Sequence, residues 1–328
     1  MKTLEIPTLF DIEQARAKIS KYLLKTPLRY SAPISKLTSA EVYIKYENHN
    51  PTCAFKVRGG VNLISKLLND KKMLNKTIIV VSTGNHGQSI AYSGKLFGFK
   101  VIVVCPQGAN ESKVQSMKDF GAEVVLYGKD FDEAREYCTK LANEKDYLYI
   151  HSANEPDLIS GVGTIGLEVY EDLPDIDCFI TAIGAGSGVC GSGIALKSKN
   201  PDIKIFGVQA SGASAVYDSF KQRKMISYPS LNTFAEGLAT RETFELPFKI
   251  MQKYIDDVFL VTDEELKHSI HLLLEYTHNI AEGAGAASLA ALIKNKQIFK
   301  EKKVVCVLTG GNLQTNTLKE VLKIKMDE

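Results

Sequence analysis

The 328-residue sequence lacks the features that mark a membrane or nucleic-acid-binding protein. No apolar run approaches the roughly 18 residues that a membrane-spanning helix needs, and the N-terminal stretch MKTLEIPTLFDIEQARAKIS contains no hydrophobic region of a signal peptide. Lysine and arginine total 40 against 38 aspartate and glutamate residues, so the formal charge of +2 gives no electrostatic case for nucleic acid or an anionic membrane. We therefore expect a cytoplasmic protein with no membrane and no nucleic-acid partner.

Patterns for disulfides and bound metals are also missing. The six cysteines are spread widely and form no Cys-x-x-Cys pair, which favours buried thiols in a reducing compartment. None of the six histidines pairs with a cysteine or a second histidine at ligand spacing on a predicted site, and His268, His271 and His278 fall among leucine and tyrosine in one helical segment. We expect no metal site.

What the sequence does contain, between Thr77 and His151, is a regular alternation of β-branched runs and helical segments. Runs such as TIIVVST and KVIVVCP alternate with segments such as HGQSIAYSGKLFG, a pattern that predicts βαβ units and a parallel sheet covered on both faces. The second half repeats this logic less regularly, with VGTIGLEVYEDL as a helix and longer loops. The length exceeds that of a usual single core. We expect an open α/β protein of two lobes, with any ligand at the carboxyl ends of the strands.

Glycines and small polar residues follow three of the predicted strands. The segment STGNHG (82–87) places free backbone N–H groups beside hydroxyl and amide side chains, which suits a carboxylate. The segment GAGSGVCG (184–191) lets the backbone approach a phosphate at a helix N-terminus. Thr309 would present a hydroxyl above the glycine floor of Gly310 and Gly311. Each segment by itself is also compatible with ordinary turn or capping chemistry.

The second of these segments also satisfies G-x-G-x-x-G, through Gly186, Gly188 and Gly191. A dinucleotide site would have an acidic residue at the end of the following strand, where this sequence has Gln209. The segment therefore favours a phosphate over a dinucleotide.

Lys56 begins a predicted helix in which Val57, Val61 and Ile64 follow the spacing of one buried face. Apolar neighbours, Phe55 among them, and the positive end of the helix favour the neutral amine that a nucleophilic lysine requires. A lysine at a helix start usually lies at the protein surface. The lysine motif therefore indicates a function only in combination with the three glycine-containing segments that follow predicted strands.

Taken in chain order, ENHNPTCAFKVRGG, STGNHGQSIAYSGKLFG, GAGSG and LTGGN resemble the motifs of the fold-type II pyridoxal-phosphate enzymes. These tryptophan synthase β-like enzymes include threonine and serine dehydratases, serine racemase and cysteine synthase. The resemblance implies pyridoxal 5'-phosphate as the cofactor and a two-domain, open parallel-sheet α/β architecture. It implies a large cofactor-binding domain of residues 1–48 plus 154–328, a small mobile domain of residues 49–153, and a homodimer.

The resemblance also implies a role for each candidate site residue. Lys56 is the catalytic residue, which holds the cofactor as a Schiff base and then removes the α-proton of the substrate. Asn85 contacts the 3-oxygen of the cofactor, the glycine segment cradles its phosphate, and Thr309 lies opposite its ring nitrogen. The expected cofactor-binding set is Phe55, Lys56, Asn85, Gly184, Ala185, Gly186, Ser187, Gly188 and Thr309, and the expected substrate-binding set is Ser82, Thr83 and His86.

Within this family, GNHGQ and FAEGLAT resemble the dehydratases and the racemase more than the cysteine synthases. We therefore expect a lyase of amino-acid metabolism, a threonine or serine ammonia-lyase that eliminates the β-hydroxyl of a small amino acid to give a 2-keto acid and ammonia. One alternative is β-replacement of the cysteine- or threonine-synthase type, because GAGSGVCG resembles the glycine loop of the synthases. Another is an amino-acid racemase with Thr83 as the second acid–base group. A non-catalytic ligand- or dinucleotide-binding protein is a further alternative.

Several positions depart from the family pattern. Gln209 and Ala215 stand where racemase-like members have acids that bind a divalent ion, which speaks against a cation site. Cys53 replaces the small glycine or serine usual before Ala-Phe-Lys. The chain ends soon after LTGGN, so we expect no separate isoleucine-binding regulatory domain. The loops near Gly161, Gly212 and Glu236 are expected to contact the substrate side chain, whose identity their residue types do not reveal.

Overall fold

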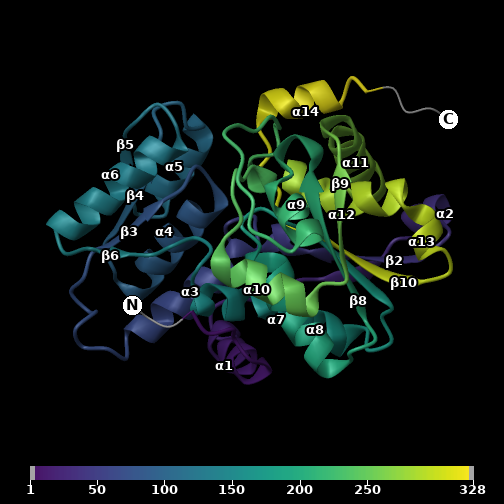
Figure 1. Cartoon of the computed structure of the whole chain (residues 1–328), viewed down its shortest axis with the longest axis horizontal. Coiled ribbons are helices and arrows are strands. Elements are labelled where there is room, and N and C mark those ends of the chain that lie inside the picture. The colour runs from purple at the N-terminus through teal and green to yellow at the C-terminus, as the bar shows by residue number, and fades with distance from the viewer. Residues whose placement is uncertain (1–3, 325–328) are drawn as a thin grey trace.

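The computed structural model describes residues 4–324, and these form two α/β lobes side by side (Figure 1). The smaller lobe contains a four-stranded parallel sheet in the order β5-β4-β3-β6. Its strands are β3 (Ile78–Val81), β4 (Val101–Cys105), β5 (Glu123–Leu126) and β6 (Leu148–Tyr149). Its helices are α4 (Asn85–Phe97), α5 (Glu111–Asp119) and α6 (Phe131–Glu144).

Both faces of the smaller sheet are covered, as the alternating pattern predicts. Ile78 and Val80 point into a cluster with residues of α4 and α5, whereas Ile79 and Val81 point to the opposite face and pack against α6. Successive strand residues face opposite sides of a sheet. A strand buried on both faces therefore reads as the unbroken β-branched run that this sequence shows.

The larger lobe contains a six-stranded sheet in the order β1-β2-β10-β7-β8-β9. Its strands are β1 (Leu28–Tyr30), β2 (Glu41–Tyr46), β7 (Cys178–Ala182), β8 (Lys204–Ala210), β9 (Asp257–Val261) and β10 (Lys303–Leu308). All pairs are parallel except the edge pair of β1 with β2. The expectation of a two-lobed α/β protein with parallel sheets is confirmed.

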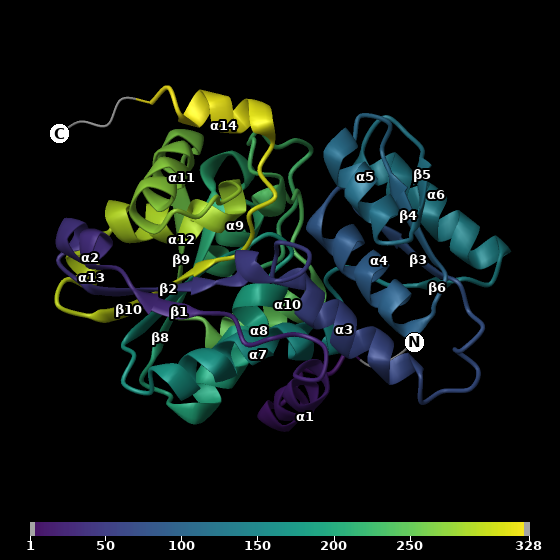
Figure 2. The same ribbon diagram turned by 180° about the vertical axis from the view of Figure 1, so that it is seen from behind.

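Helices cover both faces of this larger sheet as well. Figure 2 shows α7 (Pro156–Asp172) and α8 (Ser187–Lys199) on one side, and α11 (Asp263–Thr277) and α12 (Gly283–Lys294) on the other. The remaining helical segments are α1 (Leu9–Ile19), α2 (Ala32–Thr38), η1 (Glu47–His49), α3 (Lys56–Leu67), η2 (Ser211–Ala213), α9 (Ala215–Gln222), η3 (Glu236–Leu238), α10 (Glu245–Tyr254), α13 (Lys296–Phe299) and α14 (Thr315–Val321). Within residues 4–324, none of the helices has both the length and the apolar character to cross a membrane.

A buried ion network fixes helix α3, which begins at Lys56 and packs against both α4 and α7. The Arg58 guanidinium is fully buried and donates to Glu47 on one side and to Glu168 on the other. The buried Lys45 ammonium also donates to Glu168, at 2.6 Å. Because these charges are paired and hydrogen-bonded on all sides, their burial is tolerated. The network therefore ties the helix that carries Lys56 to β2 and α7 of the larger lobe.

Candidate active site

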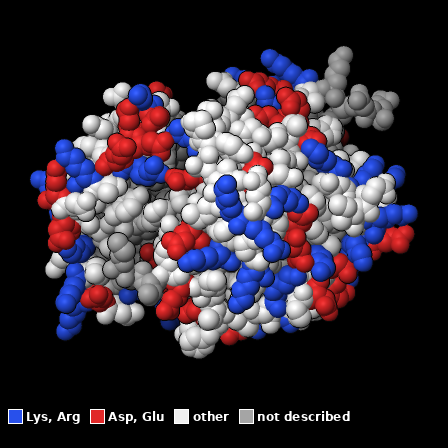
Figure 3. Space-filling model, viewed as in Figure 1, with Lys and Arg blue, Asp and Glu red and all other residues white. Residues whose placement is uncertain are grey.

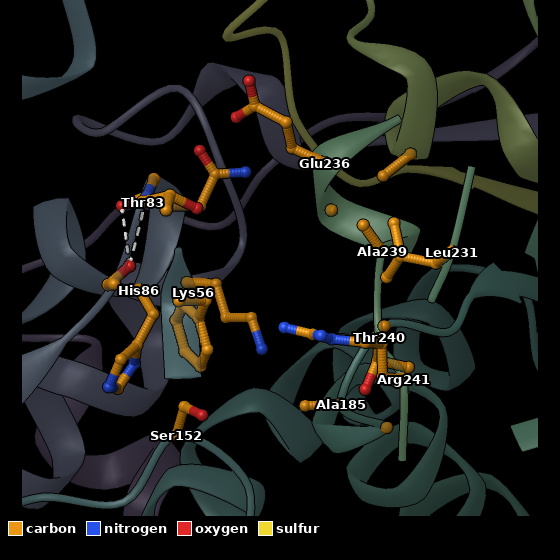
Figure 4. A pocket seen from close by; sticks show the side chains of 18 of the residues that line it. Lys56, Thr83, His86, Ser152, Ala185, Leu231, Glu236, Ala239, Thr240 and Arg241 are labelled. Carbon is orange, nitrogen blue, oxygen red and sulfur yellow. Dashed lines mark hydrogen bonds between the residues drawn. The ribbon is translucent and has the colours of Figure 1, made fainter. Parts of the chain in front are cut away.

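A cavity of about 670 Å³ lies between the two lobes, at the carboxyl ends of strands from both sheets. All twelve predicted site residues line it: Phe55, Lys56, Ser82, Thr83, Asn85, His86, Gly184, Ala185, Gly186, Ser187, Gly188 and Thr309. They follow β3, β7 and β10 or stand at the start of α3. Figure 4 shows Lys56 extending into this space, with His86 on its own side and Thr240 and Arg241 opposite. The fold thus brings together the four segments that the sequence shows far apart.

The Lys56 amine lies inside the cavity and donates a hydrogen bond to Ser187 Oγ at 2.8 Å. Its nitrogen is 5.0 Å from the centre of the Phe55 ring. Burial lowers the pKa of Lys56 to about 8, with the neighbouring Cys190 acting in the opposite direction. A substantial fraction of this amine is therefore neutral close to physiological pH, as nucleophilic attack on a carbonyl requires.

The glycine segment forms a close-fitting turn at the N-terminus of α8. Gly186 has a positive φ of 96°, which favours glycine. A Cβ atom on Gly184 would lie 2.2 Å from the backbone oxygen of Gly237, so this position admits no side chain without a shift of backbone. The first N–H groups of a helix have no partner within it, and they attract anions. The segment is therefore suited to a phosphate group.

The turn after β3 is held by Ser82. Its hydroxyl oxygen accepts hydrogen bonds from the backbone N–H groups of Gly84, at 3.1 Å, and Gly87, at 2.9 Å. The Ser82 side chain therefore shapes the turn, which makes Thr83 and His86 the freer side chains of the predicted substrate-binding set.

His86 is a neutral group in this wall of the cavity. Burial, followed by the charges of Lys56 and His151, lowers the pKa of His86 to about 3. Within residues 4–324, its Nε2 atom is buried and has no hydrogen-bond partner. A buried polar atom without a partner leaves a hydrogen bond open to a ligand.

Asn85 is held at both ends of its amide. Its Nδ2 donates to Glu282 Oε1 at 2.5 Å, and its Oδ1 accepts from Asn312 Nδ2 at 2.8 Å. Sequence reasoning missed Glu282, since an acidic residue ahead of a glycine-rich helix carries no recognisable motif. It also missed Lys113, Arg135 and Arg241, which line the cavity too.

Cross-lobe ion pairs surround the cavity. Lys113 of α5 pairs with Glu236 of η3, Arg135 of α6 with Glu242, and Asp132 of α6 with Arg241. In the space-filling view of Figure 3, side chains of both signs lie where the lobes meet. Of the loops expected to contact the substrate, the segment at Glu236 does line the cavity. Gly161 and Gly212 themselves do not line the cavity, and they pack against the backbone of Arg58 and Asn232.

Gln209, which the family resemblance places where related enzymes have an acid, makes structural hydrogen bonds. Its Oε1 accepts hydrogen bonds from the backbone N–H groups of Val216, at 3.1 Å, and Tyr217, at 2.9 Å, and so caps the first turn of α9. Within the described part of the chain, no group of three or more histidine, cysteine, aspartate or glutamate side chains is placed to hold a metal ion.

The backbone conformation at Cys53 shows why a glycine would suit this position. Its φ is +52°, in the left-handed region that costs a residue with a Cβ atom about 1–2 kcal/mol. The conformation is held because Cys53 N donates to Asn50 O at 2.8 Å and Cys53 O accepts from Gly311 N at 2.9 Å. The turn would therefore suit a glycine better than a cysteine.

We expect Cys53→Gly to raise the free energy of unfolding by about 0.5–1 kcal/mol, since glycine adopts this conformation without the Cβ penalty but loses more entropy on folding. The measurement is urea unfolding of the two proteins without cofactor. Cys53→Ala is the matched control, because it removes the thiol and keeps the Cβ atom. Equal stabilisation by both substitutions would show that the thiol, and not the backbone, is the source of the strain.

Comparisons with known proteins agree with this geometry. A family model described as pyridoxal-phosphate dependent enzyme matches residues 19–310. An L-threonine ammonia-lyase of Thermotoga maritima is 35% identical over 315 residues, 96% of this chain and 78% of that protein. A catabolic L-threonine dehydratase of Staphylococcus aureus is 35% identical over 327 residues, 98% of this chain and 94% of that protein. The solved structure of maize serine racemase is similar with a TM-score of 0.92 and 29% identity, covering 97% of each chain.

Proposed function

The chain belongs to the family of pyridoxal-phosphate-dependent enzymes, and on that basis we propose that it is an ammonia-lyase acting on threonine, serine or a related β-hydroxy amino acid. The observation that carries the proposal is the buried Lys56 amine, with its lowered pKa, in a cavity lined by all the predicted site residues. The choice of β-elimination is supported by the full-length similarity to the threonine ammonia-lyase and the threonine dehydratase.

The residues present fit the cofactor. The turn from Gly184 to Gly188 and the N-terminus of α8 would bind its phosphate, because side chains are sterically excluded at Gly184 and the first N–H groups of a helix have no partner within it. Asn85 would donate an N–H to the ring oxygen, and the buried Thr309 hydroxyl would face the ring nitrogen without a charge. When bound, pyridoxal phosphate supplies a conjugated ring that accepts electrons as bonds at the α-carbon of the amino acid break.

Lys56 would hold the cofactor and, once released by the substrate, move the α-proton on its amine. Thr83 Oγ and His86 Nε2, which has no hydrogen-bond partner among the described residues, lie on the wall that we assign to the substrate carboxylate, on the turn that Ser82 holds. A neutral imidazole can donate or accept there without adding a charge. These residues would orient the substrate so that its α-proton faces Lys56 Nζ.

We also propose that residues 49–153 form a small mobile domain and residues 1–48 plus 154–328 the large cofactor-binding domain. The ion pairs of Lys113 with Glu236 and of Arg241 with Asp132 join the two across the cavity. Closure of this kind excludes water from a site and aligns reacting groups. Charged contacts suit a reversible closure, because partly exposed ion pairs contribute little net stability.

A cytoplasmic homodimer is the form in which we propose that the enzyme acts. The six cysteines are free thiols and five of them are buried, which supports a reducing compartment. The dimer is what the family resemblance implies.

The test is a visible absorbance spectrum of the purified protein, repeated after addition of L-threonine or L-serine, with an assay for keto acid alongside. We expect visible absorbance that borohydride removes, and keto acid formation with at least one of the two amino acids. Absorbance changes with no keto acid would overturn the ammonia-lyase. That result would favour β-replacement or an amino-acid racemase in which Thr83, in the cavity wall, is the second acid–base group. Chiral analysis of the amino acid would separate these two alternatives.

A further inference from the structure

Glu282 occupies an unusual position for a helix N-cap. It is the N-cap residue of α12, yet its side chain makes no capping hydrogen bond to that helix. The carboxyl group instead points into the cavity, where Oε1 accepts from Asn85 Nδ2 at 2.5 Å. The residue is only 7% exposed. The short polar side chains preferred at an N-cap accept hydrogen bonds from their own helix, whereas this carboxyl group accepts across the cavity from Asn85.

The floor of the cavity is shaped around this carboxyl group. Glu282 N donates to Gly310 O at 3.0 Å, which fixes the start of α12 against the turn after β10. A Cβ atom on Gly310 would lie 2.5 Å from Glu282 Oε1. The absence of a side chain at Gly310 therefore makes room for the carboxyl group next to Asn85.

The hydrogen bonds around Asn85 determine which way its amide points. Asn312 Nδ2 donates both to the backbone oxygen of Thr52, at 3.0 Å, and to Asn85 Oδ1, at 2.8 Å. Because a backbone carbonyl can only accept, Asn312 must present its NH₂ group, and Asn85 must turn its oxygen toward Asn312. The Asn85 NH₂ group then faces Glu282, with one hydrogen on that carboxyl and the second left for the cavity.

Charged groups from other elements face the Glu282 carboxyl. Burial raises the pKa of Glu282, with Glu236 of η3 acting in the same direction, whereas Lys113 of α5 and the hydrogen bond from Asn85 oppose the rise. Burial raises the pKa of the Cys53 thiol, before α3, and the charge of Glu282 acts in the same direction. A protonated carboxyl still has a carbonyl oxygen that accepts. Glu282 can therefore hold the Asn85 NH₂ group in either protonation state, but more weakly once it is protonated, because a hydrogen bond to a charged carboxylate is the stronger one.

We propose that Glu282 is a positioning residue that fixes the Asn85 amide, so that an N–H and not the carbonyl oxygen is presented to the ring oxygen of the cofactor. The proposal rests on the cofactor-binding role assigned to Asn85 under the proposed function. With Glu282 removed, the amide keeps its hydrogen bond from Asn312 but loses its second anchor. Rotation then becomes easier, and a carbonyl turned toward the anionic ring oxygen would repel it.

The test measures the affinity of the cofactor-free protein for pyridoxal phosphate, by absorbance titration, in Glu282→Ala and Glu282→Gln. Loss of one hydrogen bond next to a charged group predicts about tenfold weaker binding for Glu282→Ala. Glu282→Gln keeps an oxygen that can accept from Asn85, so we expect binding within about threefold of the parent. Glu155→Gln, at the N-cap of α7 outside the cavity, is the matched control and should leave the affinity unchanged.

A double-substitution cycle with Asn85→Ala separates positioning from a general structural role. If Glu282 acts through Asn85, then Glu282→Ala weakens cofactor binding in the parent but has no further effect in the Asn85→Ala protein. Equal weakening in both backgrounds would overturn the proposal, as would unchanged affinity in Glu282→Ala. Thermal unfolding of each cofactor-free variant shows whether it is folded, and Glu282→Gln supplies the comparison if the alanine variant is not.

The pH dependence of the cofactor absorbance gives a second readout. We expect the parent to show an absorbance change as Glu282 titrates above the ordinary glutamate value of 4.5, and Glu282→Gln to lack that change. An identical titration in both proteins would contradict the proposal. Both readouts use the bound cofactor alone, so failure of the protein to form keto acid would sink the ammonia-lyase assignment and leave the role of Glu282 to be decided by them.

Discussion

Lys56→Ala should lose the visible absorbance of the cofactor-loaded enzyme and reduce kcat/KM for its amino acid by about 10²–10⁴-fold from the lost proton transfer alone. The physical reason is that no other described amine combines a place inside the cavity with a pKa lowered to about 8. Lys113, the other lysine that lines the cavity, is paired with Glu236. The measurements are the absorbance spectrum and steady-state formation of keto acid.

Lys71→Ala is the matched control for this substitution, because Lys71 is exposed just beyond the end of α3. We expect it to retain both the absorbance and the activity of the parent. If Lys56→Ala kept full turnover, the central role of this lysine would be refuted and the proposed function with it.

The second large effect concerns stability and falls on Glu168, well away from the reacting groups. Its carboxylate is fully buried and accepts from both Arg58, at 2.8 Å, and Lys45, at 2.6 Å. Glu168→Gln keeps the size of the side chain but leaves two buried cations short of a counter-charge. Breaking a buried ion pair in this way costs about 3–5 kcal/mol.

Urea unfolding of the cofactor-free proteins measures this cost. Glu171→Gln, one turn along α7, is the matched control, because Glu171 is half exposed and pairs with Lys25 at the surface. A surface pair of this kind contributes about 0–1 kcal/mol. Similar small losses in both variants would show that the network around Arg58 is not what holds α3.

The same network predicts a pH dependence with a definite sign. Burial alone would raise the pKa of Glu168, but the charges and hydrogen bonds of Arg58 and Lys45 lower it from 4.5 to about 2. As the pH falls, the carboxyl group of the unfolded protein is protonated at a higher pH than the same group in the folded protein. Its stabilising contribution is therefore complete above about pH 4.5 and is lost as the pH falls toward 2. The stability difference between the parent and Glu168→Gln should shrink over that interval.

Local patterns in the sequence predicted the parallel α/β architecture, and the resemblance of four segments to the fold-type II enzymes predicted the candidate site residues. The β-branched run TIIVVST is a strand buried on both faces, and burial of both faces is what removes polar residues from such a run. The segments STGNHG (82–87) and GAGSGVCG (184–191) lie at the carboxyl ends of parallel strands. That placement brings them to the same edge of their sheets whatever the details of packing. The helix predicted from Lys56 onward begins at that residue.

Contacts between distant residues decided the rest. The hydrogen bond between Asn85 and Glu282 joins positions 197 residues apart, and that between Arg58 and Glu168 joins positions 110 residues apart. Helix and strand periodicities relate residues only a few positions apart, so they predict neither of these contacts. The hydroxyl of Ser82 was expected on the substrate, and only the folded turn shows it accepting from Gly84 and Gly87.

The sequence by itself determined which chemistry this protein can carry, because that depends on the kinds of residue at strand ends and helix starts. The tertiary structure alone decided how those residues are held. The direction of the Asn85 amide, the partners of the buried Arg58 and the positive φ of Cys53 each follow from groups brought together by folding. Hydrogen-bond direction and the pairing of buried charges depend on distances of a few ångströms, and only the packed chain sets such distances.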